Sequence, residues 1–177
     1  MDFRQNYFEL FGLPVGFEID AKALTERYRD LQRALHPDRF ANAPDQERRL
    51  SLQQAAQVNS AYETLRDPLS RARYLLQLQG VEYSDESSTI NDLEFLEQQM
   101  ELRERLAEIR HNDDPATALA GFMAQLEVSS RAQVEALRLL FAQGETVDAA
   151  KGKNLVQRMQ FLRRLQQETE ALEEELL

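Results

Sequence analysis

The chain has no cysteine among its 177 residues. This absence excludes disulfide bonds, thiolate metal ligands and cysteine nucleophiles, and it fits a reducing compartment. Histidine is nearly as scarce, with two copies, so we expect no zinc site and no bound cofactor. No apolar run approaches the roughly 18 residues that cross a bilayer, and the first residues show no signal-peptide pattern. We therefore expect a cytoplasmic protein.

Acidic residues outnumber basic ones, and the excess is unevenly distributed. The formal net charge of −10 argues against nucleic acid and membrane partners, because exposed cations supply most of the affinity for anionic surfaces. Residues 1–79 hold 11 basic and 11 acidic side chains, whereas residues 80–177 hold 10 and 20. This split suggests two units with different partners.

Apolar residues recur every three or four positions, which predicts an all-α protein. Glycine, proline and capping residues divide the pattern into helices. Residues 1–79 are expected to form an antiparallel helical hairpin with short flanking helices. A polar, acidic linker over residues 80–90 follows, and residues 91–177 are expected to form a three-helix bundle. The last helix should begin at Thr146 or within residues 151–154.

The triplet His36-Pro37-Asp38 interrupts a helical pattern. Pro37 has no N–H group and disfavours helical angles at the residue before it, so the helix is expected to end there. The triplet could be a helix stop and nothing more. It could also be a docking site for an acidic protein surface, because basic side chains of the preceding helix lead up to it. Those side chains lie within about 40° of one another and are Lys22, Arg29 and Arg33.

Residues 3–76 resemble a J-domain, the module through which co-chaperones engage DnaK-family chaperones. The resemblance rests on the short first helix, the helix pair around the triplet, the run "NSAYETL" at residues 59–65, and Asp67-Pro68. In that family the triplet is needed to stimulate ATP hydrolysis by the chaperone, and the basic second helix docks on its nucleotide-binding domain. The resemblance implies a chaperone-binding site made of His36, Pro37, Asp38, Arg27, Arg29 and Arg33.

The chain also departs from common J-proteins. Thr25 and Asp30 stand where many J-domains have basic residues, which implies docking that is weaker or tuned to a particular chaperone. A Gly/Phe-rich segment and zinc-finger cysteines are missing, so residues 90–177 are expected to bind the client.

The first predicted helix of the second half carries two apolar stripes. One is expected to be a core stripe and contains Phe95, Leu102, Leu106 and Ile109. The other lies about 140° away and contains Leu93, Leu96 and Met100. The second stripe could be part of a wide buried face or an exposed partner-binding strip with a charged rim.

The acidic helical second half, with "FLEQQMELRE" on its first helix, resembles the HscB family of co-chaperones, which pair with the chaperone HscA in iron–sulfur cluster biogenesis. In that family the C-terminal domain binds the cluster scaffold IscU. Glu97 departs from the family pattern, because relatives can carry an apolar residue there. The scaffold-binding residues implied by the resemblance are Leu96, Met100, Glu101, Arg103, Glu104 and Phe161.

No set of nucleophile and base residues is visible, so we expect a non-enzymatic protein. The leading hypothesis is a co-chaperone that stimulates the ATPase of an HscA-like chaperone and delivers an IscU-like scaffold to it. Two alternatives stay open: a J-protein that serves a general DnaK with another client, and a structural helical-bundle subunit.

Overall fold

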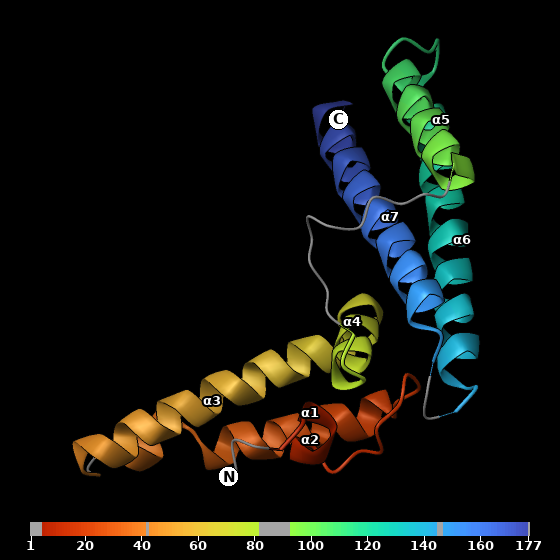
Figure 1. The fold of residues 1–177 in the computed structure, drawn as a ribbon. Coiled ribbons are helices and arrows are strands. Elements are labelled where there is room, and N and C mark those ends of the chain that lie inside the picture. Colours follow the sequence, from red (N-terminus) through yellow and green to blue (C-terminus); the bar gives the residue numbers. More distant parts are fainter. Residues whose placement is uncertain (1–4, 42, 82–92, 145–146, 177) are drawn as a thin grey trace. The chain divides into compact units, whose positions relative to one another are not determined.

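The computed structural model describes residues 5–41, 43–81, 93–144 and 147–176, and these residues form helices without strands (Figure 1). The predicted all-α class is confirmed. The chain divides into two compact units, Met1–Leu75 and Leu76–Leu177. Of the predicted linker, residues 82–90 lie outside the described residues. The predicted limits of the two domains therefore stay a prediction.

The first unit is built around a pair of helices. Its helices are α1 (Tyr7–Leu10), α2 (Ala21–Ala34), the short 3-10 helix η1 (Pro37–Phe40), α3 (Asp45–Arg66) and the greater part of α4 (Pro68–Leu78), whose last residues from Leu76 onward belong to the second unit. The Asp20 carboxylate caps α2 as predicted, because it accepts hydrogen bonds from the N–H groups of Lys22 and Ala23 at 2.9 Å each. Gly12 adopts a φ of +61°, which lets the chain turn sharply after α1.

Aromatic and aliphatic side chains from several helices form the core of the first unit. Phe8 and Phe11 from the first turns and Leu24 of α2 are all at most 1% exposed. Val58 and Leu65 of α3 are fully buried. The Tyr74 ring of α4 stacks on Tyr7 at 4.4 Å between centroids, and its hydroxyl accepts a 2.9 Å hydrogen bond from the Tyr7 N–H. These contacts fasten α1 and α4 together.

The second unit contains three long helices, as predicted. They are α5 (Leu93–Ile109), α6 (Pro115–Phe141) and α7 (Ala149–Leu176). Asp114 caps α6 by accepting the Thr117 N–H at 3.1 Å. The last helix begins at Ala149, and the Asp148 carboxylate accepts the Lys151 N–H at 3.0 Å. The sequence interpretation missed this cap and placed the helix start on either side of it.

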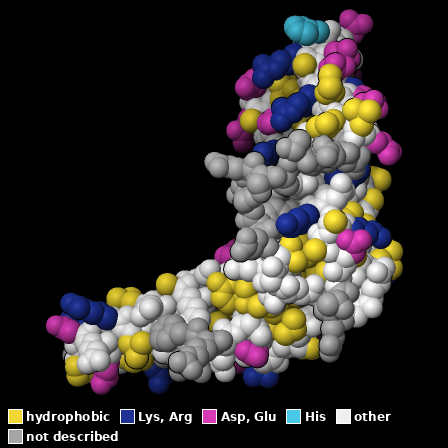
Figure 2. Space-filling model, viewed as in Figure 1, with side chains coloured by type: hydrophobic (Ala, Val, Ile, Leu, Met, Phe, Trp, Pro, Cys, Tyr) yellow, Lys and Arg dark blue, Asp and Glu magenta, His cyan; other side chains and the backbone are white. Residues whose placement is uncertain are grey.

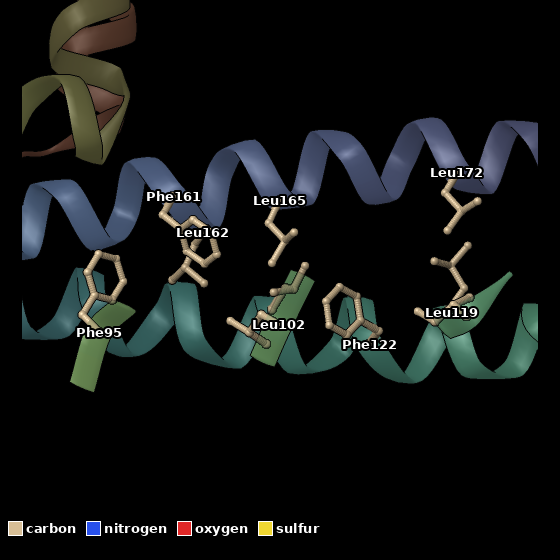
Figure 3. Packing of buried hydrophobic residues seen from close by; sticks show 10 residues of the cluster. Phe95, Leu102, Leu119, Phe122, Phe161, Leu162, Leu165 and Leu172 are labelled. Atoms are coloured by element: carbon tan, nitrogen blue, oxygen red, sulfur yellow. The ribbon is translucent and has the colours of Figure 1, made fainter. Parts of the chain in front are cut away.

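Figure 3 shows the core of the second unit, in which large apolar side chains of the three helices meet. The predicted core stripe of α5 is confirmed, because Phe95, Leu102 and Ile109 are at most 5% exposed and Leu106 packs against them at the margin. The rings of Phe95 and Phe161 meet edge to face, with 5.8 Å between their centroids. This contact joins α5 to α7.

Candidate functional site

The triplet forms a corner between α2 and η1. His36 has extended backbone angles and precedes η1, and Pro37 occupies the first position of η1, where a missing N–H costs nothing. The Arg39 N–H donates to the His36 carbonyl at 3.0 Å, and the Asp38 N–H donates to His36 Nδ1 at 3.3 Å. The corner is therefore held by the triplet's own atoms.

Both polar side chains of the triplet face solvent. The side chain of Asp38 is 90% exposed and that of His36 is 60% exposed. His36 Nδ1 lies 3.6 Å from Asp38 Oδ2. In neutral His36 this nitrogen accepts the Asp38 N–H, so Nε2 carries the ring hydrogen and is the donor. The corner thus offers a carboxylate and an imidazole N–H to another protein.

The predicted basic residues of α2 are all exposed, but they do not form one cluster. Arg29 and Arg33 line the same groove as His36 and Pro37. Arg27 is exposed but is not part of that lining, since it lies about 160° from Arg29 around the helix. Arg33 also forms an ion pair with Asp30, one of the two positions noted above as departing from the J-domain pattern.

The groove itself was not foreseen from the sequence. It has a volume of about 740 Å³ and runs between α2 and α3 beside the triplet. Leu35, Pro37, Ala55 and Val58 give it an apolar floor, and charged side chains of α2 border it. The small side chain of Ala55, opposite the end of α2, was the signal that could have indicated it.

The run at residues 59–65 holds the two groove walls together. The ring of Tyr62 stacks on that of Tyr28 at 3.9 Å between centroids. The Tyr28 hydroxyl donates to Asn59 Oδ1 at 3.1 Å, and Gln32 Nε2 reaches the same oxygen at 3.4 Å. These contacts fix α2 on α3 and so fix the position of the corner.

The second predicted stripe of α5 is exposed, which decides between its two interpretations. Leu93 is 70% exposed, Leu96 43% and Met100 64%. Glu101 and Glu104, two of the predicted scaffold-binding residues, are exposed as well. In Figure 2 apolar side chains lie among acidic and basic ones over α5. An exposed apolar strip with a charged rim is typical of a partner-binding surface.

Phe161 does not join this exposed strip. It is 8% exposed and belongs to the core between α5 and α7 (Figure 3). The guanidinium of Arg103 lies 5.8 Å from the centre of its ring and also pairs with Glu168 at 3.3 Å. Phe161 and Arg103 thus contact each other at the core, and their predicted contribution to scaffold binding stays a prediction.

Two features of this region escaped the sequence interpretation. Arg158 of α7 covers the ring of Phe95 at 4.6 Å and donates to Asn154 at 2.8 Å. Arg110 pairs with Glu175 at 2.7 Å, seven residues beyond the Arg103–Glu168 pair on both helices. For the second feature the signal was the seven-residue spacing from Arg103 to Arg110, the residue after α5, and from Glu168 to Glu175 on α7.

The described part of the chain offers neither a metal site nor a membrane span. No group of three or more histidine, aspartate or glutamate side chains among the described residues could hold a metal ion. None of the described helices combines the length and the apolar character required to span a membrane.

The comparisons with known proteins agree with both halves of this description. Residues 6–74 match the family model of the DnaJ domain, and residues 91–170 match that of the HSCB C-terminal oligomerisation domain. A co-chaperone protein HscB homolog from Shewanella pealeana is 43% identical over 172 residues, which is 97% of this chain and 99% of the relative. The chain belongs to the HscB family of J-domain co-chaperones.

Solved structures of the family have the same fold. Chaperone HscB from Vibrio cholerae superposes with a TM-score of 0.87 at 42% identity, over 98% of this chain and all of the other. Human co-chaperone protein HscB superposes with a TM-score of 0.89 at 28% identity, over 98% of this chain and 84% of the other. The relatives from Shewanella pealeana and Vibrio cholerae are both named as co-chaperones and not as enzymes, which favours a non-enzymatic role.

Proposed function

We propose that this chain stimulates the ATPase of an HscA-type, DnaK-family chaperone and delivers an IscU-type iron–sulfur scaffold to it. One observation supports the proposal: a single chain exposes two surfaces of different chemical character. The first is the exposed corner at His36-Pro37-Asp38 beside Arg29 and Arg33. The second is the exposed strip of Leu93, Leu96 and Met100.

The two surfaces differ in the chemistry that they offer. The corner and the arginines of α2 suit an acidic surface, since guanidinium groups make forked contacts with carboxylates. The strip on α5 suits an apolar partner surface with a basic rim, because the helix carries five glutamates and two arginines. Two surfaces of such different character support binding of a chaperone at one and a client at the other.

The proposal is tested by measuring ATP hydrolysis by purified HscA with and without IscU. The substitution His36→Gln should abolish stimulation while scaffold binding, followed by calorimetry, stays unchanged. The matched control is His111→Gln, which changes the second, exposed histidine at the end of α5 and should leave both measurements unchanged. Normal stimulation by His36→Gln would refute the chaperone-binding site.

The scaffold-binding half is tested separately. Leu96→Ala combined with Met100→Ala should weaken scaffold binding and leave stimulation without scaffold intact. The matched control is Leu52→Ala on α3, because Leu52 is 58% exposed, a value between those of Leu96 and Met100. If purified HscA fails to respond but a general DnaK does, the chain serves another chaperone. If neither responds, the role of a structural helical subunit is favoured.

A further inference from the structure

The methionines of this chain differ in how freely a dissolved molecule can reach them. Met100 on α5 is 64% exposed, whereas Met159 on α7 is 8% exposed. Met123 on α6 is partly buried and packs against the core of the second unit. Met1 lies outside the described residues. Of the three methionines that the structure describes, Met100 is therefore the one that solvent reaches most freely.

Met100 also lies where a change of polarity has a consequence. It belongs to the exposed strip of α5, and the proposed contact with the scaffold depends on the apolar character of that strip. The thioether of methionine is apolar, flexible and polarisable, which suits it to a binding surface. Oxidation to the sulfoxide makes the same side chain polar. One added oxygen atom would alter the strip and leave the core unchanged.

We propose that Met100 is an oxidation site at which a peroxide lowers the affinity for the scaffold, an inference that rests on the proposed function. The sulfur lone pair attacks one oxygen of hydrogen peroxide, the O–O bond breaks, and the sulfur keeps that oxygen as a sulfoxide. The departing hydroxide takes the proton of the transferred oxygen and leaves as water. The sulfur is thereby oxidised by two electrons, and the peroxide is reduced by two.

The new oxygen atom needs a hydrogen-bond donor once a partner covers the strip. The side chains one helical turn from Met100 on α5 are a leucine and two ionised carboxylates, which cannot donate, and Arg103. The guanidinium of Arg103 already pairs with Glu168 at 3.3 Å. Water serves the sulfoxide in the free chain, but a docked scaffold displaces that water. Covering an unpaired polar group in this way should weaken binding roughly tenfold.

Oxidation should affect the scaffold half of the proposed function and spare the chaperone half. The residues that line the groove beside the triplet include no methionine. The chain also has no cysteine, so no thiol of its own competes for the peroxide or forms a disulfide. A response to peroxide can therefore be assigned to methionine sulfur.

The site is tested on the full chain, treated with hydrogen peroxide and freed of it before any partner is added. Mass spectrometry of its peptides should show the sulfoxide at Met100 before Met123 or Met159. Calorimetry with IscU should then show affinity reduced roughly tenfold. Stimulation of HscA without scaffold and the circular dichroism spectrum should not change. Oxidation of Met159 ahead of Met100, or unchanged binding by a chain fully oxidised at Met100, would overturn the proposal.

Two variants assign the effect to one sulfur atom, Met100→Leu and the matched control Met123→Leu. The affinity of each variant after peroxide is compared with its own affinity before treatment. Peroxide should leave the affinity of Met100→Leu at its untreated value and should weaken Met123→Leu as much as the wild type. Methionine sulfoxide reductases with a thiol reductant should restore binding to the oxidised wild type. An equal loss in Met100→Leu, or no recovery once the sulfoxide is reduced, would contradict the assignment.

This inference and the proposed function can fail separately. If the untreated chain does not bind IscU, the proposed function fails and the effect on binding fails with it. The peptide map still decides in that case whether Met100 is the preferred oxidation site. If the untreated and the oxidised chain bind IscU equally well, the proposed function stands and the inference about Met100 is wrong.

Discussion

At the scale of the residue, the triplet shows how one short stretch serves structure and recognition together. Pro37 ends α2 because it cannot donate a hydrogen bond. His36 becomes the cap of η1 for that reason, and its ring nitrogen accepts the Asp38 N–H. Asp38 is left almost entirely in solvent. The helix stop and the candidate binding corner are therefore the same feature.

Phe161 is a residue whose role the structure redefines. Its ring is buried against Phe95, so Phe161→Ala should lower the free energy of unfolding of the second unit by about 3–5 kcal/mol through lost burial and a cavity. Leu96→Ala and Met100→Ala change exposed side chains and should cost about 0.5 kcal/mol or less. Denaturant unfolding followed by circular dichroism measures the three values. A Phe161→Ala protein as stable as Leu96→Ala would contradict the buried position.

Tyr74 predicts how the first unit responds to alkaline pH. Burial is the main cause that raises the pKa of Tyr74 above its ordinary value of 10.0. The hydrogen bond that its hydroxyl accepts from the Tyr7 N–H lowers the pKa and offsets part of this rise. Above about pH 10 the unfolded chain loses a proton that the folded chain keeps. The contribution of Tyr74 to the free energy of unfolding is therefore fully present below about pH 10. It is lost as the pH rises through the pKa that Tyr74 has in the folded chain.

The test compares thermal unfolding of the wild type and Tyr74→Phe between about pH 8 and about pH 11. The variant should be less stable at the lower pH, because the Tyr7 N–H loses its acceptor, and its stability should decline less steeply with pH. The free energy of unfolding of Tyr28→Phe, another tyrosine of the same unit, provides a comparison. An equal slope for the wild type and Tyr74→Phe would exclude the titration of Tyr74 as a cause.

At the scale of the element, α5 shows what periodicity can and cannot predict. The spacing of apolar residues located the core stripe of Phe95, Leu102 and Ile109 correctly. The spacing could not predict whether the stripe of Leu96 and Met100 is buried or exposed, because burial depends on how far the neighbouring helices extend around α5. That extent follows from the packing of three helices together, which a single helix pattern does not contain.

The same limit explains the two other misses. The groove beside the triplet is lined by residues of both α2 and α3, among them Ala55. It depends on the pairing of these two helices, which Tyr28, Asn59 and Tyr62 hold in register. Asp148 was passed over as the cap of α7 because neighbouring residues offered equally good starting signals. By contrast, Asp20 stood alone before a strong helical pattern, and its cap was predicted correctly.

Two helical glycines are expected to respond differently to substitution by alanine. Gly121 lies on the surface of α6, and a methyl group added there would meet no atom within 4 Å, so Gly121→Ala should raise the free energy of unfolding by about 0.8–1 kcal/mol. Gly152 of α7 is buried, and a Cβ there would lie 2.7 Å from Leu76 Cδ2. Gly152→Ala should therefore show little or none of that gain. Denaturant unfolding of the two variants checks the contrast, and an equal gain for both would refute the close approach of Leu76.

At the scale of the whole molecule, the uneven charge distribution gives the two proposed binding surfaces different electrostatic surroundings. Residues 1–79 are neutral overall and carry the corner with its arginines, whereas residues 80–177 carry the full excess of acid and the apolar strip. Opposite surface character reduces the chance that one partner occupies both surfaces. Joining the surfaces in one chain also raises the concentration of a bound client near the chaperone, which two separate proteins would not do.

This last point can be tested with full-length chains. A His36→Gln chain should hold the scaffold without stimulating the chaperone, and a Leu96→Ala, Met100→Ala chain should do the reverse. If delivery requires both surfaces on one molecule, an equimolar mixture should give the chaperone's basal stimulation without the extra contribution of the scaffold. The lost advantage corresponds to about 10²–10⁴-fold in apparent affinity. ATPase titrations with scaffold measure it, and wild-type activity of the mixture would show that the two surfaces act independently.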